Sequence, residues 1–374
     1  MPSHGGFRAC NSLDTHLGHF GLPIAYYLYL RAVWLGRPWG VRRDHSFKPM
    51  VTVIVPTYNE AKLIESKLDD IARQDYPRGG LEVIVVDSAS TDGTLESVER
   101  WSEGNPGLNL RVISEPYRMG KAYALNNALR HASGDIVVIT DADSRWGSER
   151  TLSNTVAWLS DPTVGAVTCV KNPERGGFLG VEGGYRGFYN TVRLAESKAW
   201  STPVFHGELA AFRRELLEAI GGFPTDIGAD DSHTATLVAL RGYRAVAVDD
   251  VECVEKVPEE GYHAWRVRRA QHLVQHFLKI LRHVGRAPNR FKPILLVEAY
   301  LHLVNPWLLL VTITLMLYQA LKGSFIAIVI STVGLLLLVH RPYRIWVITQ
   351  LYLIMAILRN IWIKEIIWTK QDKY

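Results

Sequence analysis

The sequence predicts an α/β fold, with a mostly parallel, doubly wound sheet followed by hydrophobic C-terminal helices. Two observations predict it. From residue 50 to about residue 260, short Val/Ile runs alternate with charged amphipathic segments, which is typical of an α/β domain. From Ile294 onward the composition changes sharply to long runs that carry almost no charge. We therefore expect an N-terminal segment (1–49), an α/β domain (50–260), a basic helix (261–292) and a transmembrane region (293–374).

Three apolar runs in the first half of the chain are predicted to be buried strands that end in polar residues. The runs and their polar ends are 51–55 with 56–60, 81–86 with Asp87, and 135–140 with Asp141 and Asp143. The carboxyl ends of parallel strands meet at one edge of a sheet, so these residues are expected to border one ligand crevice.

The segments between these strands have helical patterns. We expect a crossover helix over 60–74 with Asn59 as N-cap, a helix from about residue 94 to 103, and a helix over 119–131 that contains Lys121. Residues 110–114 form a further strand candidate. The first strand is not followed by G-x-G-x-x-G, and G-x-x-x-x-G-K-[ST] occurs nowhere, which disfavours a dinucleotide dehydrogenase or a P-loop NTPase.

The Asp141-Ala142-Asp143 motif presents two carboxylates one residue apart at a strand end. Oxygen ligands in this arrangement suit Mg²⁺ or Mn²⁺, and such an ion can hold a nucleotide diphosphate. Alone the motif is a weak signal, because acidic residues also follow strands and begin helices.

Three hydrophobic runs occupy the C-terminal part: 294–321 with one charge, Glu298, and 324–339 and 345–358 with none. Roughly 20 apolar residues cross a bilayer, so the first run suffices. The other two are short, and they either draw on flanking residues or form a hairpin that does not fully cross. We expect two to three membrane helices, with the side of the C-terminal residues 370–373 left open.

The formal net charge is +5, and eight basic residues cluster in the segment just before the first hydrophobic run. They are Arg266, Arg268, Arg269, Lys279, Arg282, Arg286, Arg290 and Lys292. A basic cluster beside a membrane entry indicates the cytoplasmic side and favours anionic headgroups. We therefore expect a basic helix at the membrane interface over 263–283, and we disfavour a nucleic-acid partner.

Three further features bear on location. Residues 22–35 are apolar and aromatic but short for a span, so they form either an interfacial helix or a helix packed on the α/β domain. No secretory signal pattern begins the sequence. Cys10, Cys169 and Cys253 lie far apart without metal or disulfide spacing, which indicates thiols in a reducing compartment.

Four motifs in order carry a family resemblance: residues 53–60, 85–94, 120–126 and 141–143. Together they resemble family 2 glycosyltransferases with the GT-A fold, over about residues 51–271. The hydrophobic C-terminal part resembles the anchors of the integral-membrane members.

The resemblance implies a transferase that binds a nucleotide-sugar donor, UDP- or GDP-linked, with Mn²⁺ or Mg²⁺. Pro56, Tyr58, Glu60 and Asp87 would hold the nucleoside, and Lys121 the diphosphate. Asp143 would be the main metal ligand, with Asp141 beside it near the ribose. Alternatively, Glu60 is only a favourable charge at a helix start, and Lys121 only a solvated helix residue.

A second part of the resemblance concerns the acceptor. In the family, a Glu-Asp pair follows a small-residue turn, a strand and two arginines, and its second member is the general base. Here residues 206–214 lead to Asp230-Asp231, so Asp231 inherits the role of base and Asp230 replaces the glutamate at the acceptor. His206 is a further candidate acceptor contact. Alternatively, the acidic pair caps the helix expected over 232–241, and His206 is an ordinary loop histidine.

The last motif covers residues 265–273. Processive members such as cellulose, chitin and hyaluronan synthases carry Gln-x-x-Arg-Trp here, whereas this sequence has Arg268, Arg269 and Gln271 but no Arg-Trp after the glutamine. The departure favours a non-processive enzyme. Arg268, Arg269 and Gln271 would contact the donor diphosphate; the alternative for the arginines is lipid headgroups.

The resemblance thus predicts inverting, metal-dependent sugar transfer to a hydroxyl of a membrane lipid or lipid-linked saccharide, giving a glycolipid. The enzyme would be a multi-pass protein of the cell (inner) membrane, with its catalytic domain in the cytoplasm. A polyprenyl-phosphate (dolichol-phosphate) sugar synthase, a processive polysaccharide synthase and a non-catalytic scaffold are the alternatives. The sequence does not select the sugar.

Overall fold

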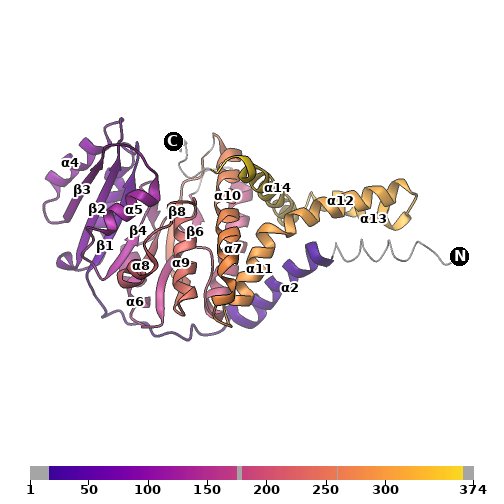
Figure 1. Ribbon diagram of the computed structural model, residues 1–374, viewed down its shortest axis with the longest axis horizontal. Helices are drawn as coiled ribbons and strands as arrows, with labels where there is room; N and C mark the ends of the chain where they lie inside the picture. The colour runs from indigo at the N-terminus through magenta and orange to yellow at the C-terminus, as the bar shows by residue number, and fades with distance from the viewer. Residues whose placement is uncertain (1–16, 175–178, 259, 365–374) are drawn as a thin grey trace.

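The computed structural model describes residues 17–174, 179–258 and 260–364 (Figure 1). One eight-stranded sheet, in the order β3-β2-β1-β4-β7-β6-β8-β5, forms the centre of the α/β domain. Its strands are β1 (Val51–Thr57), β2 (Leu81–Ser88), β3 (Asn109–Glu115), β4 (Ile136–Ile139), β5 (Ser144–Trp146), β6 (Val164–Pro173), β7 (Ala210–Arg213) and β8 (Arg244–Glu255).

The sheet is mixed, where the sequence predicted a mostly parallel one. Strands β3, β2, β1 and β4 are parallel neighbours, as are β6 and β8. However, β7 runs antiparallel to both β4 and β6, and β5 antiparallel to β8. The reversal of β7 has a consequence for the site: its N-terminal end lies beside the C-terminal end of β4, where Ile139 pairs with Ala210.

Helices cover both faces of the sheet. They are α3 (Ile64–Ala72), α4 (Thr94–Gly104), α5 (Lys121–Leu129), α6 (Thr151–Trp158), α7 (Leu179–Ala199), α8 (Arg214–Ile220) and α9 (Asp230–Leu240). The predicted helices are present, but the first begins at Ile64, so Asn59 is not its N-cap. Asn59 instead has a positive φ of 56° and accepts a hydrogen bond from the Thr91 backbone N–H, which ties the β1 loop to the β2 loop.

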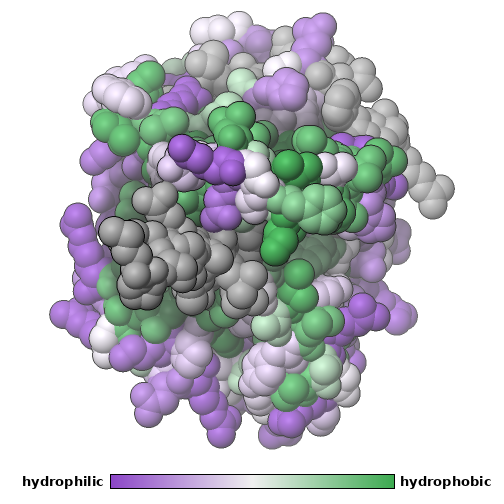
Figure 2. Space-filling model, turned by 90° about the vertical axis from the view of Figure 1, so that its right-hand side faces the viewer, coloured by the Kyte–Doolittle hydropathy of each residue, from purple (hydrophilic) through white to green (hydrophobic). Residues whose placement is uncertain are grey.

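The C-terminal helices are α10 (Tyr262–Ile280), α11 (Lys292–Leu303), α12 (Asn305–Leu321), α13 (Phe325–Leu337) and α14 (Arg341–Trp362). Helices α12 and α13 form a hairpin that projects from the α/β domain (Figure 1). Figure 2 looks onto that end of the molecule, where hydrophobic side chains gather on the surface. Leu321 is 87% exposed and Val339 80%.

By length and composition, α14 alone could cross a membrane among the described helices. The pair α11 and α12 passes the same criterion jointly, with a bend of 48° between the two helices. These helices overlap the runs 294–321 and 345–358 that the sequence predicted as membrane segments, and α14 extends beyond the second of these runs at both ends. The predictions for residues 365–374 concern residues outside the described part.

Helix α10 differs from the predicted interfacial helix. It packs against α9, α11 and α14, and its Trp265, Val274 and Phe277 are buried. Arg266 and Arg268 are buried too. The first part of the predicted basic cluster is therefore enclosed by protein, whereas Arg282, Arg286 and Arg290 at its other end are exposed.

The N-terminal segment is described from residue 17. Helix α2 (Leu22–Tyr29) continues as a π-helical turn over Leu30–Leu35, and Leu30 is buried against Val192 and Ala195 of α7. On the other side, Ile24 and Leu28 are each 55% exposed. The segment thus packs on α7 with one face and leaves an apolar face open.

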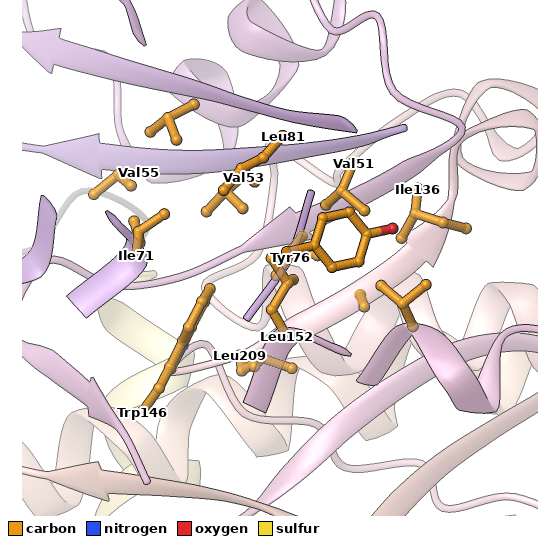
Figure 3. Close-up of a cluster of buried hydrophobic side chains, with 14 of the residues drawn as sticks. Val51, Val53, Val55, Ile71, Tyr76, Leu81, Ile136, Trp146, Leu152 and Leu209 are labelled. Carbon is orange, nitrogen blue, oxygen red and sulfur yellow. The ribbon is translucent and has the colours of Figure 1, made fainter. Parts of the chain in front are cut away.

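Two hydrophobic layers hold the sheet, one on each face. Val51, Val53 and Val55 of β1 belong to one layer, and Ile54 between them belongs to the other. Figure 3 shows the first layer, in which the β1 valines lie with Ile71 and Trp146. Burial on both faces explains why the strands read as continuous apolar runs. Cys169 and Cys253 are buried free thiols, and Cys10 lies outside the described residues.

Candidate active site

A cavity of about 270 Å³ lies at the edge of the sheet where β1 and β4 end and β7 begins. Its wall is built from the loops after β1 and β4, the turn before β7, the first turns of α5 and α9, and parts of α7, α10 and α14. Of the predicted site residues, it is lined by Pro56, Tyr58, Glu60, Lys121, Asp141, Asp143, His206, Asp230, Asp231, Arg268 and Arg269.

Lys121 is the central cation of this cavity. It occupies the first position of α5, and its Nζ lies 2.7 Å from Asp141 Oδ1 and 3.4 Å from Asp230 Oδ2. Burial acts against its charge, but Asp141, Asp230 and Asp231 outweigh that effect and raise the pKa of Lys121 well above its ordinary value. Lys121 is therefore a permanent cation held by acids from two different elements, and not a solvated helix residue.

The Asp141-Ala142-Asp143 turn lies directly after β4. The Asp141 backbone N–H donates to the Gly207 carbonyl at 3.0 Å, and Ser144 Oγ donates to the Asp141 carbonyl at 2.8 Å. Burial raises the pKa of the Asp141 carboxyl, and Asp143 and Glu208 raise it further. The backbone of the motif is thus fixed, and its two carboxylates repel each other.

These carboxylates fit a divalent cation in part. No group of three or more His, Cys, Asp or Glu side chains among the described residues could hold a metal by itself. Mg²⁺ and Mn²⁺ are, however, commonly held by one or two carboxylates together with substrate phosphates. Asp141 and Asp143 match that donor set, because the cavity also offers room and cations for a diphosphate.

The Asp230-Asp231 pair occupies the first turn of α9. The N-cap residue is Ala229, which makes no capping hydrogen bond, but Asp231 Oδ1 accepts a hydrogen bond from the Ser232 backbone N–H at 2.6 Å. Asp231 therefore satisfies a donor at the start of the helix, as the capping alternative predicted, and no such bond involves Asp230 among the described residues. Burial and the neighbouring Asp230 raise the pKa of Asp231 to about 7. A carboxylate with a pKa near neutrality can accept a proton efficiently at physiological pH, which is what a general base requires.

The loop after β1 forms the opposite end of the cavity. Pro56, Tyr58 and Glu60 line it, and the Arg118 guanidinium lies 3.8 Å from the centre of the Tyr58 ring. Asp87 lies behind this wall and does not line it. Its carboxylate is buried and accepts a hydrogen bond from the Ser90 backbone N–H at 3.0 Å, so it shapes the loop that follows β2.

The α10 residues separate into two groups. Arg268 and Arg269 line the cavity, and Arg269 forms an ion pair with Glu255. Gln271 is fully buried elsewhere and donates a hydrogen bond to the Ile363 carbonyl, just past the end of α14. The structure thus places Gln271 in the contact between α10 and the end of α14, and not in the cavity where the sequence predicted it.

His206 lines the cavity in the turn before β7. Burial lowers the pKa of its imidazole well below the usual range, and the nearby Lys171 lowers it further. The ring is therefore neutral at physiological pH. It is suited to a hydrogen bond with a neutral group such as a hydroxyl, because it offers both a donor and an acceptor nitrogen.

Sequence reasoning missed a buried group of charges beside the cavity. Lys171 Nζ lies 2.7 Å from Glu208 Oε1 and 3.3 Å from Glu255 Oε1, and Arg186 Nη2 lies 2.6 Å from Glu255. Glu208 lies in the same segment as His206, residues 206–214, but the sequence predicted no role for it. One feature of the sequence could have identified Lys171: it is a lysine in an otherwise apolar strand. A buried charge needs a partner, so an acidic residue was to be expected beside it.

Comparison with known proteins identifies the family and the fold. Residues 52–221 match the model of Glycosyl transferase family 2. The mannosyltransferase PcManGT from Pyrobaculum calidifontis, solved in complex with GDP-Man and Mn²⁺, has a TM-score of 0.87 and 57% sequence identity. That similarity covers 94% of this chain and 98% of the other. TarS 1–349 of S. aureus has a TM-score of 0.50 at 22% identity, covers 68% of this chain and 72% of the other, and shows the shared fold alone.

More distant relatives are polymer synthases. The poly-beta-1,6-N-acetyl-D-glucosamine synthase of Staphylococcus aureus (strain COL) is 27% identical over 230 residues, 59% of this chain and 54% of that protein. The synthase of the same name from Staphylococcus epidermidis is 24% identical over 255 residues, 66% of this chain and 60% of that protein. The chain spans little more than half the length of these relatives. Taken with the cavity, these similarities show that the chain belongs to glycosyl transferase family 2 and is a GT-A-type enzyme of nucleotide-sugar transfer.

Proposed function

We propose that this enzyme is an inverting, metal-dependent glycosyltransferase that moves one hexose from a GDP-linked donor to a hydroxyl of a membrane lipid or lipid-linked saccharide. The observation that carries this proposal is the position of Asp231. The Asp231 carboxylate, which is partly buried and whose pKa is raised to about 7, lines the same cavity as Lys121 and the Asp141-Asp143 pair. The proposed base and the proposed donor site thus border one cavity, in which the acceptor hydroxyl and the transferred sugar could meet.

The choice of donor rests on the similarity to PcManGT, which extends over nearly the whole chain. That protein was solved with GDP-Man and Mn²⁺, so GDP-mannose with Mn²⁺ is the first combination to test here. Asp143 and Asp141 would hold the cation. When bound, it would neutralise charge on the diphosphate of the donor.

The chain's own residues account for the other requirements of the reaction. Tyr58 and Glu60 line the end of the cavity proposed for the nucleoside, and Lys121, Arg268 and Arg269 provide positive charge for the diphosphate. Asp231 would take the proton from the acceptor hydroxyl as its oxygen attacks the anomeric carbon. A single displacement of this kind inverts the anomeric configuration.

The acceptor is proposed from the surroundings of the cavity. Thr349, Tyr352 and Leu353 of α14 line its far side, and α14 is long and apolar enough to cross a membrane. The exposed apolar hairpin of α12 and α13 and the open face of α2 lie on the same part of the molecule (Figure 1). These features support a membrane-anchored enzyme whose cavity opens toward lipids. The basic residues that precede α11 favour the cytoplasmic side for the α/β domain.

The test is turnover of sugar nucleotides by the purified full chain. It would be incubated with Mn²⁺, a membrane lipid extract and, in turn, GDP-mannose, UDP-glucose and UDP-N-acetylglucosamine. We expect glycolipid formation with GDP-mannose, one hexose per lipid by mass spectrometry, and an inverted anomer by NMR. A retained anomer would refute the single displacement, and turnover with only the UDP-sugars would refute the donor assignment.

A processive polysaccharide synthase is the second candidate, because the curated relatives are named as polymer synthases. It predicts long products in the same assay. A polyprenyl-phosphate acceptor is the third, and it predicts substantial activity after Asp231→Asn, since a phosphate needs no base.

A further inference from the structure

Glu208 is a buried carboxylate in the wall of the cavity to which neither the sequence nor the roles above assign a function. Its backbone is fixed by the segment that carries the metal-binding pair. The Glu208 carbonyl accepts hydrogen bonds from Thr140 Oγ1 at 2.7 Å and from Trp146 Nε1 at 3.1 Å. The position of Glu208 is therefore as well defined as that of Asp141.

The two oxygens of its side chain are not equivalent. Oε1 accepts a hydrogen bond from Lys171 Nζ at 2.7 Å, whereas Oε2 accepts none from any residue that the structure describes. The Glu208 side chain is 6% exposed, and that of Lys171 is fully buried. Buried polar oxygens nearly always have a donor, and one that has none asks for an explanation.

The fixed geometry of Lys171 explains why it does not satisfy both oxygens. Its Nζ also lies 3.3 Å from Glu255 Oε1, and Glu255 is paired with Arg186 and Arg269. Lys171 is thus shared between two carboxylates from β8 and the turn before β7. Lys171, Glu255, Arg186 and Arg269 thus hold the Glu208 side chain in one orientation. Its Oε2 is left to accept a hydrogen bond from a donor outside this set of residues.

Glu208 also lies close to the reacting groups. A Cβ added at the preceding residue, Gly207, would lie 2.8 Å from both Asp141 Oδ2 and Lys121 Nζ. The charge of Glu208 acts on Asp141 and on Asp231, whose pKa values it raises. A sugar placed between the donor site and the base would therefore pass within reach of Glu208.

We propose that Glu208 Oε2 accepts a hydrogen bond from a hydroxyl of a sugar bound in this cavity, and that Lys171 positions the carboxylate for this contact. The inference rests on the proposed function. Hydrogen bonds to an ionised acceptor are stronger than neutral ones, and a site built around a buried polar group strongly rejects an analogue that lacks its partner. Glu208 is thus a specificity-determining residue. The hydroxyl belongs either to the transferred hexose or to the acceptor saccharide.

The experiment compares wild type with Glu208→Gln and Glu208→Asp, using the full chain with Mn²⁺. Two rates are measured: hydrolysis of GDP-mannose in water without lipid, and transfer into lipid extract. If the hydroxyl is on the transferred hexose, both rates fall. If it is on the acceptor, only transfer falls, through KM of the lipid. If neither variant changes either rate, the proposal is overturned, while turnover by wild type still supports the proposed function.

A second measurement excludes a merely structural effect. Monodeoxy donors are compared by kcat/KM in wild type and variants. Where the hexose is the source, wild type should reject one deoxy donor by about tenfold or more, and Glu208→Gln should lose that rejection alone. A uniform loss across all deoxy donors, together with unchanged KM for lipid, would refute the contact.

The matched control is Glu182→Gln. Glu182 is a buried carboxylate of the same charged group, paired with Arg186 and Arg266, but it does not line the cavity. It should leave the hydroxyl preference and the ratio of hydrolysis to transfer as in wild type. If Glu182→Gln changes both in the same way as Glu208→Gln, the effect belongs to the charged group and the proposal fails. Glu208→Asp keeps the charge, so it remains informative if Glu208→Gln does not fold.

Discussion

Lys121 Nζ lies 2.7 Å from Asp141 Oδ1, joining the start of α5 to the end of β4. Lys121 is a cation and Asp141 an anion, and the proposed ligand, a diphosphate with its bound metal ion, also carries one negative and one positive part. When the ligand binds, Asp141 can therefore pair with the metal ion and Lys121 with the diphosphate, so that neither side chain is left without a partner. This exchange of partners is an economical way to build a site for a charged ligand, because both states are neutralised.

Replacing Lys121 by Met should weaken the binding of GDP-mannose in the presence of Mn²⁺ by roughly ten- to a hundredfold, or about 1.4–2.8 kcal/mol. The reason is that a partly buried cation is lost from the diphosphate site. Isothermal titration calorimetry measures the effect. Lys121→Arg is the matched control and should retain more of the affinity; equal affinities of wild type and Lys121→Met would show that the lysine does not contact the donor.

Asp143→Asn should remove the Mn²⁺ dependence of donor binding. An amide is a weaker ligand for a hard cation than a carboxylate, so the gain in affinity that Mn²⁺ gives to wild type should largely disappear. The measurement is donor affinity with Mn²⁺ and with EDTA. Asp226→Asn, a change on the exposed surface beside Lys279, is the control. An unchanged Mn²⁺ effect in Asp143→Asn would mean that the cation binds elsewhere.

Asp231→Asn should lower kcat by about 10²- to 10⁴-fold while donor affinity changes little, because general-base catalysis contributes in that range. Single-turnover rates and donor titrations separate the two effects. The variant should also be more stable at pH 8, since a carboxyl whose pKa is raised by burial destabilises the folded state when ionised. We expect a gain on the order of 1 kcal/mol. Preserved kcat would favour a phosphate acceptor.

The pH dependence of kcat/KM follows from the same group. Asp231 acts as a base only when deprotonated, and its pKa is raised to about 7. The rate should therefore rise as pH increases through about 7 and then level off, instead of being flat above pH 5 as an ordinary aspartate would give. A profile with no inflection between pH 6 and pH 8 would contradict the role of Asp231 as base.

Two glycines give a matched pair of substitutions. A Cβ at Gly207 would lie 2.8 Å from the ends of the Asp141 and Lys121 side chains, which can shift. A Cβ at Gly134 would lie 2.5 Å from the backbone nitrogen of Thr52 in β1, which cannot shift without disturbing the sheet. Gly207→Ala should thus reduce turnover with little change in melting temperature, and Gly134→Ala should lower stability by a few kcal/mol. A thermal melt and an activity assay on both variants check this.

Several features of the site follow from local sequence alone. The strands ending near Glu60, Asp87 and Asp143 were predicted because continuous apolar runs with polar ends identify buried parallel strands and their edge. The alternation of these strands with amphipathic segments also predicted the order of helices. Both signals depend on residues close together in the chain, which is why they can be read without the structure.

The positions of other residues were decided by contacts between distant segments. Gln271 has the spacing of a donor contact, but its side chain is captured by the end of α14, 92 residues later. Arg266 was predicted to lie on a basic face at the membrane interface, yet it is buried and paired with Glu182 of α7. The same holds for Lys171 and Glu208, which pair across 37 residues only because β7 runs antiparallel.

The sequence by itself determined the class of fold, the edge of the sheet that carries the chemistry and the two acidic pairs placed there. Tertiary structure alone decided the direction of β7, the burial of α10 and the pairing of the charges beside the cavity. The physical reason is range: strand patterning reflects burial, which each residue type expresses locally, whereas the partner of a buried charge depends on which distant segment the fold brings within about 3 Å of it.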